Sequence, residues 1–188
     1  ELHVRGATVL AVSDISGGIY SPDGLDVPDL HAYVAEHGSL DGYERCERIT
    51  NEQLLELPCD LLIVAAREDQ LTIANAANVH ARLVVEGANG PTTLEADAIL
   101  AERGITVVPD ILANAGGVTV SYFEWVQDLG RLFWDRDEIR TRLADKMNDA
   151  FDRVWSVADE TGITLRQAAM VAAIREVAGA LEARVIYP

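Results

Sequence analysis

Four short apolar runs of this chain each end in polar or small residues of the kinds that bind ligands. A carboxylate accepts hydrogen bonds from ribose hydroxyls, and an amide side chain both donates and accepts. Glycine and alanine let a flat ligand lie close to the backbone. Because ligands of an open parallel sheet bind beyond the carboxyl ends of its strands, the four endings together predict one cleft. The endings are Asp14, Ala65 to Gln70, Glu86 to Thr93 and Pro109 to Val118.

Asp14 follows the β-rich run Thr8–Ser13 and has two interpretations. An acid at the end of a strand in a dinucleotide-binding sheet accepts hydrogen bonds from the adenine ribose. The alternative is a turn or helix-cap residue, since aspartate is common in turns. Gly17-Gly18 follows closely and is expected to break the extended segment.

Three continuous apolar runs predict strands that are buried on both faces. They are Asp60–Ala65, Leu83–Val85 and Thr106–Val108, and Leu94–Arg103 between the last two has helical periodicity. The repeating order of strand and helix predicts an α/β fold with a Rossmann-like, doubly wound parallel sheet.

Local signals predict smaller elements around these runs. Asp26 is expected to cap a helix that runs to His37, and Arg48–Thr50 is a short strand candidate. Asn51 is expected to cap a helix over Glu52–Leu57.

The last third of the chain has a helical pattern. One amphipathic helix is expected from about Glu138, and a second from about Thr164 to Ala183, with a possible strand at Val185-Ile186. A boundary near Asp135 divides the chain into a partial dinucleotide-binding domain, residues 1–135, and a C-terminal helical segment, residues 136–188.

The charge of the chain limits its partners. It carries 31 acidic and 15 basic residues, a formal net charge of −16, and this disfavours binding to nucleic acid. Lys146 is the single lysine among the cations. Many carboxylates with almost no lysine keep a protein hydrated in strong salt, which predicts a halophilic source. An acidic protein from a GC-rich genome is the alternative.

Other classes of protein find no support in the sequence. The longest apolar stretch is Leu61 to Ala66, much shorter than the ~20 residues of a membrane span. Glu1 opens the chain without a secretory leader, so we expect a cytoplasmic protein. Cys46 and Cys59 match no zinc spacing, and no histidine pair suggests a metal site.

Several longer stretches resemble the C-terminal, nucleotide-binding part of glutamate dehydrogenases. They cover nearly the whole chain, and the block at 109–127 is long and specific. The stretches are VSDISGGIYSPDGLD (12–26), CDLLIVAAREDQLT (59–72), EGANGPTT (86–93), PDILANAGGVTVSYFEWVQ (109–127) and LRQAA (165–169).

The resemblance implies reversible oxidative deamination of L-glutamate to 2-oxoglutarate and ammonia, with hydride passing to NAD or NADP. It leaves the choice between NAD and NADP open, and it suggests a homohexamer. It also implies a role for individual residues. Asp14 would lie near the adenosine ribose; Ala65, Ala66 and Gln70 would line the dinucleotide; Asn89 and Asn114 would meet its nicotinamide-ribose end; and Val118 and Ser121 would reach the substrate.

Ser121 is the residue that favours glutamate as the substrate. A hydroxyl that donates to the side-chain carboxylate of glutamate makes a charge-assisted hydrogen bond. An apolar substrate would leave a buried hydroxyl unpaired, which costs about 1–3 kcal/mol. The alternatives are another amino-acid dehydrogenase and a non-catalytic regulatory subunit of the same fold.

The sequence also lacks parts that the family has. It contains no G-x-G-x-x-G, so the central first strand and its glycine loop are expected before Glu1. The catalytic lysine and aspartate of the family are expected in the same missing N-terminal region. Residues 1–188 alone are therefore expected neither to bind dinucleotide well nor to catalyse.

Overall fold

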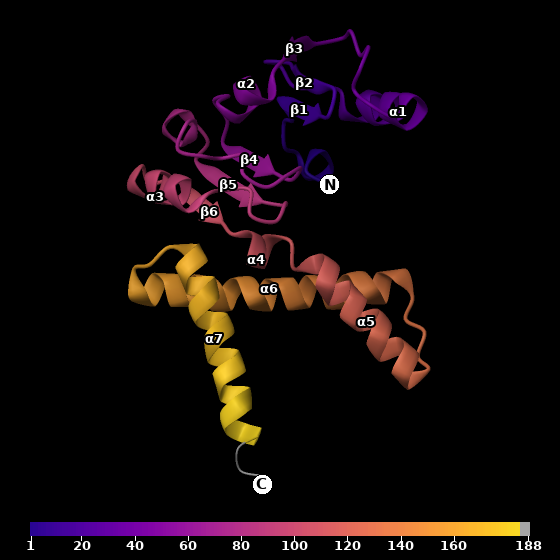
Figure 1. Ribbon diagram of the computed structural model, residues 1–188. Coiled ribbons are helices and arrows are strands. Elements are labelled where there is room, and N and C mark those ends of the chain that lie inside the picture. The colour runs from indigo at the N-terminus through magenta and orange to yellow at the C-terminus, as the bar shows by residue number, and fades with distance from the viewer. Residues whose placement is uncertain (185–188) are drawn as a thin grey trace.

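The computed structural model describes residues 1–184 and contains two three-stranded sheets above a layer of long helices (Figure 1). The possible strand at Val185-Ile186 lies outside the described residues. The strands are β1 (Ala11–Asp14), β2 (Gly17–Tyr20), β3 (Glu47–Ile49), β4 (Leu61–Val64), β5 (Leu83–Glu86) and β6 (Thr106–Val108). The helices are α1 (Val27–His37), α2 (Asn51–Leu55), α3 (Leu94–Glu102), α4 (Asp110–Ala113), α5 (Gly116–Gly130), α6 (Arg136–Thr161) and α7 (Leu165–Arg184), with short 3-10 turns η1 (His3–Arg5) and η2 (Ala76–Asn78).

The second sheet is parallel, in the order β4-β5-β6, and it confirms the predicted α/β fold. Leu62 and Val84 are buried in its centre, and they pack with Leu100 of α3 in one apolar cluster. A second cluster joins α4, α6 and α7 through Leu112, Val157 and other side chains. The three apolar runs predicted the three strands, but the expected burial on both faces was wrong for β4: Leu62 and Val64 are buried, whereas Ile63 on the other face is 41% exposed.

The first sheet is antiparallel, in the order β1-β2-β3, which corrects the expectation that the first run belongs to a parallel sheet broken at Gly17-Gly18. The chain turns back after Asp14, and both glycines lie inside β2. Gly18 lies close to β3: a Cβ there would lie 3.0 Å from Cγ1 and 3.2 Å from the carbonyl oxygen of Ile49, so a larger residue would require β3 to shift by a few tenths of an ångström.

β1 and β4 each lie at an edge of their own sheet, and no strand pairing joins the two sheets within residues 1–184. An unpaired strand edge exposes a row of backbone N–H and C=O groups that can pair with a further strand. The edges agree with the expectation that these two strands lack a common neighbour.

Capping hydrogen bonds determine where the short helices begin. Asp26 accepts a hydrogen bond from the backbone N–H of Asp29 and caps α1, as predicted. The cap of α2 is Thr50, and the prediction of Asn51 was wrong by one residue. Thr50 and Gln53 form a reciprocal capping box, which asparagine at 51 cannot do because it already lies inside the helix.

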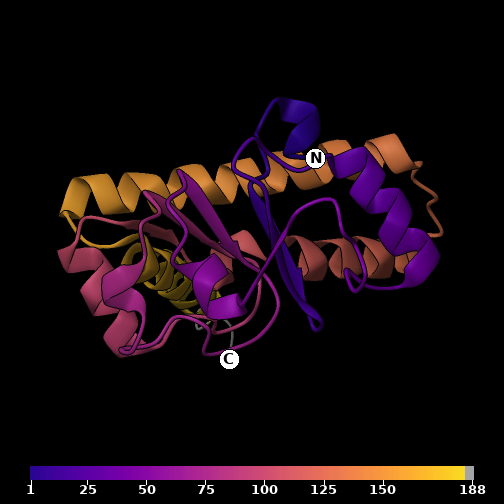
Figure 2. The ribbon, with the colours of Figure 1, turned by 90° about the horizontal axis from the view of Figure 1, so that it is seen from above.

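The C-terminal helices form the base of the molecule. Asp135 caps α6 by accepting hydrogen bonds from the N–H groups of Asp137 and Glu138. α6 then extends across the molecule beneath both sheets, and α7 crosses it (Figures 1 and 2). Within residues 1–184, none of the helices has the length and apolar character that crossing a membrane requires.

Candidate functional site

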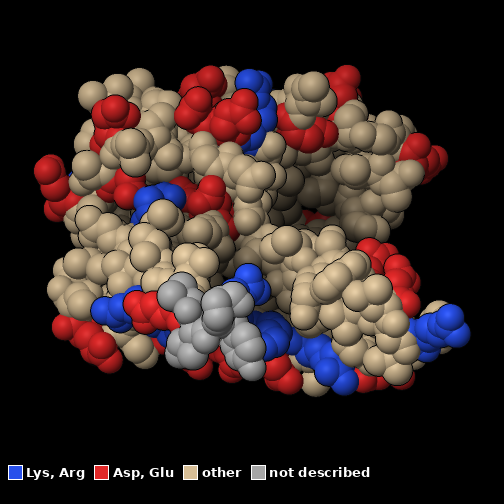
Figure 3. All heavy atoms as spheres, turned by 60° about the horizontal axis from the view of Figure 1, so that its bottom comes forward, with Lys and Arg blue, Asp and Glu red and all other residues tan. Residues whose placement is uncertain are grey.

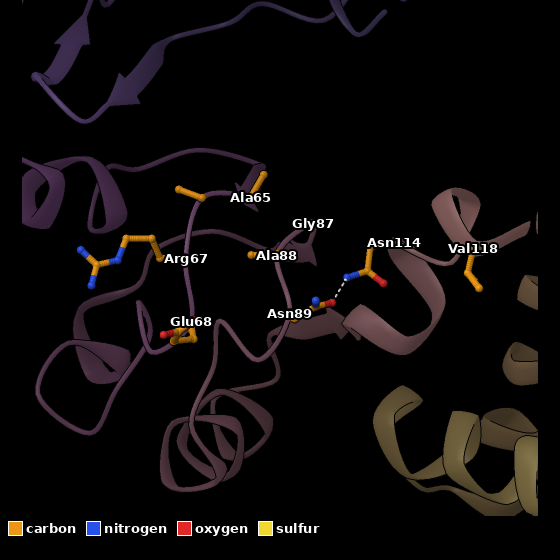
Figure 4. Close-up of a pocket in the computed structure, with 9 residues that line it drawn as sticks. Ala65, Arg67, Glu68, Gly87, Ala88, Asn89, Asn114 and Val118 are labelled. Atoms are coloured by element: carbon orange, nitrogen blue, oxygen red, sulfur yellow. Dashed lines mark hydrogen bonds between the residues drawn. The ribbon is translucent and has the colours of Figure 1, made fainter. Parts of the chain in front are cut away.

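A pocket of about 560 Å³ opens at the carboxyl ends of β4 and β5, beside the start of α5 (Figure 4). Parallel strands bring their carboxyl ends to one edge of the sheet, and this edge is where open α/β sheets bind ligands. Nine residues line the pocket: Ala65, Ala66, Arg67, Glu68, Gly87, Ala88, Asn89, Asn114 and Val118.

Close contact between two loops forms one wall of the pocket. Val64 and Glu86 are paired at the ends of β4 and β5, so Ala65 and Gly87 continue side by side. A Cβ added at Gly87 would lie 2.9 Å from the Cβ of Ala65, a distance that real Cβ atoms do not reach. The N–H groups of Gly87 and Ala88 donate to the carbonyl oxygen of Val64 at 2.9 and 3.0 Å. Gly87 thus allows the loops that follow β4 and β5 to run in direct contact with each other.

Two asparagine side chains from neighbouring loops meet at the pocket. Asn114 Nδ2 donates a hydrogen bond to Asn89 Oδ1 at 2.7 Å, and Figure 4 shows the two side chains pointing toward one another. Asn114 Oδ1 and Asn89 Nδ2 make no hydrogen bond within residues 1–184, so the pair keeps a free acceptor oxygen and a free N–H₂ group for a ligand. This combination complements a carboxamide group, which has one N–H₂ and one C=O.

Of the remaining predicted residues, Gln70 lies behind the pocket wall. Its Oε1 accepts a hydrogen bond from Asn51 Nδ2 at 3.0 Å, and its Nε2 donates to the carbonyl oxygen of Glu68 at 3.0 Å. Gln70 therefore braces the loop that carries Glu68, and it is not among the lining residues.

Asp14 lies in the other sheet and holds its hairpin turn. Its carboxylate accepts hydrogen bonds from the N–H of Ser16 at 2.7 Å, from Ser16 Oγ at 2.6 Å and from the N–H of Leu40 at 2.7 Å. Partial burial raises the pKa of Asp14, but these hydrogen bonds outweigh it and leave the pKa below its ordinary value. The contacts are those of a turn residue, and Asp14 does not line the pocket.

The predicted substrate residues lie on α5. Val118 lines the pocket, and Ser121 follows three residues later, which places both on the same side of the helix. Ser121 is exposed, not buried as the sequence analysis assumed, and its hydroxyl is not unpaired without a substrate, because it donates to the carbonyl oxygen of Gly117 at 3.2 Å. The structure therefore brings Ala65, Ala66, Asn89, Asn114 and Val118 into one pocket, with Ser121 a turn away from its lining.

A buried ion cluster behind the pocket was missed by the sequence analysis. Glu86 is fully buried at the end of β5, and its Oε1 lies 2.7 Å from Arg166 Nη2. Burial lowers the pKa of Arg166, but hydrogen bonds to Glu86 and Asp97 raise it above its ordinary value, so the guanidinium stays charged. The only signal in the sequence was an acidic residue, Glu86, at the end of an apolar run. Its partner Arg166 lies 80 residues further along the chain, so no local pattern connects the two.

Metal binding and thiol reactivity both depend on titratable side chains. Across residues 1–184, no three His, Cys, Asp or Glu side chains gather closely enough to hold a metal ion. Burial raises the pKa of both Cys46 and Cys59, so each thiol stays protonated near neutral pH.

Comparison with known proteins places this arrangement in a family. The sequence profile of the Glutamate/Leucine/Phenylalanine/Valine dehydrogenase family matches residues 1–184. A glutamate dehydrogenase of Thermotoga maritima is 56% identical over 183 residues, which are 97% of this chain and 44% of that protein. Glutamate dehydrogenase B of Halobacterium salinarum is 46% identical, over 97% of this chain and 43% of its own length.

A solved structure shows the same fold. It is a hetero-hexameric glutamate dehydrogenase from Thermus thermophilus in a Leu-bound form, with 37% identity and a TM-score of 0.88 over 99% of this chain and 44% of that one. The chain thus spans less than half the length of the relatives that it matches. The profile and the relatives confirm the resemblance seen in the sequence: the chain belongs to the glutamate/leucine/phenylalanine/valine dehydrogenase family.

Proposed function

We propose that the chain is the dinucleotide-binding part of a glutamate dehydrogenase, which converts L-glutamate to 2-oxoglutarate and ammonia. The observation that carries the proposal is the pocket at the ends of β4 and β5, with the asparagine pair at its edge. The curated relatives quoted above are all named glutamate dehydrogenases. Residues 1–135 would form the partial dinucleotide-binding domain, and residues 136–188 the C-terminal helical segment.

NAD or NADP is the implied cofactor, and the pocket fits its nicotinamide end. The space beside Gly87 would be lost to any larger side chain, and the free amide atoms of Asn89 and Asn114 match a carboxamide. When bound, the cofactor supplies the hydride acceptor. Asn89 and Asn114 would orient the nicotinamide, and Ala65 and Ala66 would let it lie close to the backbone.

The substrate would be held from α5. Val118 is the residue of α5 that lines the pocket, and Ser121 carries the hydroxyl that would donate to the side-chain carboxylate of glutamate. In this structure that hydroxyl donates to its own helix, so it must give up this hydrogen bond before it can donate to a substrate. The bond gained is charge-assisted and is stronger than the one given up.

We propose that the chain acts within a longer protein, the complete polypeptide, because its relatives are more than twice as long. The unpaired edges of β1 and β4 would accept the further strand that carries the glycine loop. The catalytic lysine and aspartate would come from the same additional segment, since Lys146 is exposed on α6 and does not line the pocket.

The test of this function is a comparison of substrates with the complete polypeptide. Reduction of NAD and of NADP is measured with glutamate, leucine, phenylalanine and valine side by side. We expect glutamate to give the highest kcat/KM by about 100-fold, as a site built around a polar contact rejects analogues that lack it. Faster turnover of leucine than of glutamate would identify leucine as the substrate and contradict the proposal. No turnover of any of the four would favour the regulatory-subunit alternative.

The assembly and the cellular setting are further proposals. We propose a cytoplasmic homohexamer, although the Thermus relative is a hetero-hexamer. Size measurement of the purified complete polypeptide, expressed without a second gene, tests this. An active hexamer supports the proposal, and a protein that needs a different subunit for activity contradicts it.

The surface charge predicts how stability depends on salt. The formal net charge is −16, and acidic side chains are spread over the face shown in Figure 3. Salt screens their mutual repulsion over about 3 Å at 1 M ionic strength. We expect the melting temperature of the complete polypeptide to rise steeply from low to molar salt. An unchanged melting temperature across this range would contradict a halophilic source and favour an ordinary acidic protein.

A further inference from the structure

Arg166, in the first turn of α7, contacts three carboxylates from three other elements. Its Nη2 lies 2.7 Å from Glu86 Oε1 at the end of β5 and 3.0 Å from Asp97 Oδ1 on α3. Its Nη1 lies 3.7 Å from Asp110 Oδ1 at the start of α4. Within residues 1–184 it is the one cation that comes within 4.0 Å of these acids. α7 is thereby fixed to the end of the parallel sheet.

A short series of hydrogen bonds leads from this cluster to the asparagine pair. Glu86 Oε2 accepts the N–H of Asp110 at 2.8 Å, and Asp110 Oδ2 accepts the N–H of Gly90 at 2.8 Å. Asn89 lies directly before Gly90 in the same loop. The N–H of Asn114 donates to the carbonyl oxygen of Asp110 at 3.0 Å. Both loops that carry the pair are therefore bonded to residues that Arg166 contacts.

Burial makes the contact with Arg166 necessary. Glu86 has no solvent exposure, and the Arg166 side chain is 21% exposed. A buried carboxylate that loses its cationic partner is strongly destabilised, so the loop would rearrange to bring the carboxylate to water. Such a rearrangement would move the segment from Glu86 to Gly90, which contains Asn89.

From this arrangement we propose that Arg166 is a positioning residue: it holds the loops of Asn89 and Asn114 in the geometry that orients the nicotinamide for hydride transfer. The inference rests on the proposed function and adds a residue that lies outside the pocket lining. Replacement of Arg166 should affect the binding of the nicotinamide end of the cofactor. The cluster contacts the loops after β5 and β6 and does not reach the first sheet.

The first test replaces Arg166 in the complete polypeptide, at a temperature well below the melting point of each variant. We expect Arg166→Met to lower kcat with glutamate by about 10- to 100-fold, because small displacements of reacting groups have effects of this size. The Kd of ADP, a probe of the adenosine half alone, should stay unchanged. Arg166→Lys keeps the charge but loses the fork of donors, so it should recover part of kcat.

A matched control is available on the same helix pair. Arg153 of α6 and Glu176 of α7 form an exposed ion pair of 3.5 Å that also joins two elements. Exposed ion pairs contribute little to stability, so Arg153→Met should leave both kcat and the Kd of ADP unchanged. If Arg166→Met behaves like Arg153→Met, or if kcat and the Kd of ADP change equally, the proposal is wrong.

A second measurement separates the proposal from the proposed function. Hydrogen exchange of the complete polypeptide needs no turnover, and we expect Arg166→Met to speed exchange in residues 86–91 and 110–115 but not in α1. Unchanged exchange there would overturn the inference whether or not glutamate is oxidised. If Arg166→Met does not fold, Asp97→Asn, which removes one of the three contacts, takes its place. It should show the same pattern with a smaller amplitude, and no change would count against the proposal.

Discussion

Gly87→Val in the complete polypeptide should lower kcat/KM for the nicotinamide cofactor by about 100-fold, because the new side chain forces apart two loops that the reaction needs in register. At this position even a Cβ would lie 2.9 Å from Ala65 Cβ and 3.3 Å from Ala65 Cα. Both neighbours belong to the backbone or are attached directly to it, so they cannot rotate out of the way. Gly87→Ala should have the same effect at a smaller amplitude.

The measurement is the dependence of rate on cofactor concentration, together with the melting temperature of each variant. Gly179→Ala is the control, since a Cβ there meets no atom within 4 Å, and alanine is the better helix former. We expect it to leave cofactor kinetics unchanged. Wild-type kinetics in Gly87→Val would show that the narrow approach of β4 and β5 does not shape the cofactor site.

Ser121→Ala should reduce kcat/KM for glutamate by about 10- to 100-fold, the equivalent of a lost hydrogen bond to a charged group of about 1.5–3 kcal/mol. Removal of the hydroxyl should leave the rate with leucine unchanged or raise it, because an apolar side chain does not pair with the hydroxyl. Substrate preference would thus shift in one step from the acidic toward the apolar amino acid.

Ser121→Thr provides the conservative comparison, because it keeps the hydroxyl at the same place on α5 and should retain most of the preference for glutamate. The measurement is kcat/KM for both amino acids at saturating cofactor. An equal loss with glutamate and leucine in Ser121→Ala would assign the residue to folding or helix geometry and would remove it from the substrate site.

The parallel sheet was predictable because its sequence signal is local. Leu61–Val64 and Leu83–Val85 are continuous apolar runs, a pattern typical of strands in a parallel sheet. The antiparallel sheet was not predictable in the same way. Gly17 and Gly18 weaken any strand pattern. Gly17 has a φ of 120°, and Gly18 lies close to Ile49, more than thirty residues further along the chain.

Part of the site could be predicted for a related reason. Asn89 and Asn114 each follow a strand of one parallel sheet, so the rule that such endings converge was enough to bring them together. The hydrogen bonds of Asp14 with Leu40 and of Gln70 with Asn51 are not indicated by any spacing in the sequence. Arg166 is the extreme case, as its partner Glu86 is separated from it by 80 residues.

The most direct test of the central claim is an experimental structure of the complete polypeptide with oxidised dinucleotide and glutamate bound. We predict that the nicotinamide carboxamide contacts Asn89 and Asn114, with the side-chain carboxylate of glutamate at the Ser121 hydroxyl. A dinucleotide whose nicotinamide lies away from this asparagine pair, on another edge of the sheet, would contradict the account.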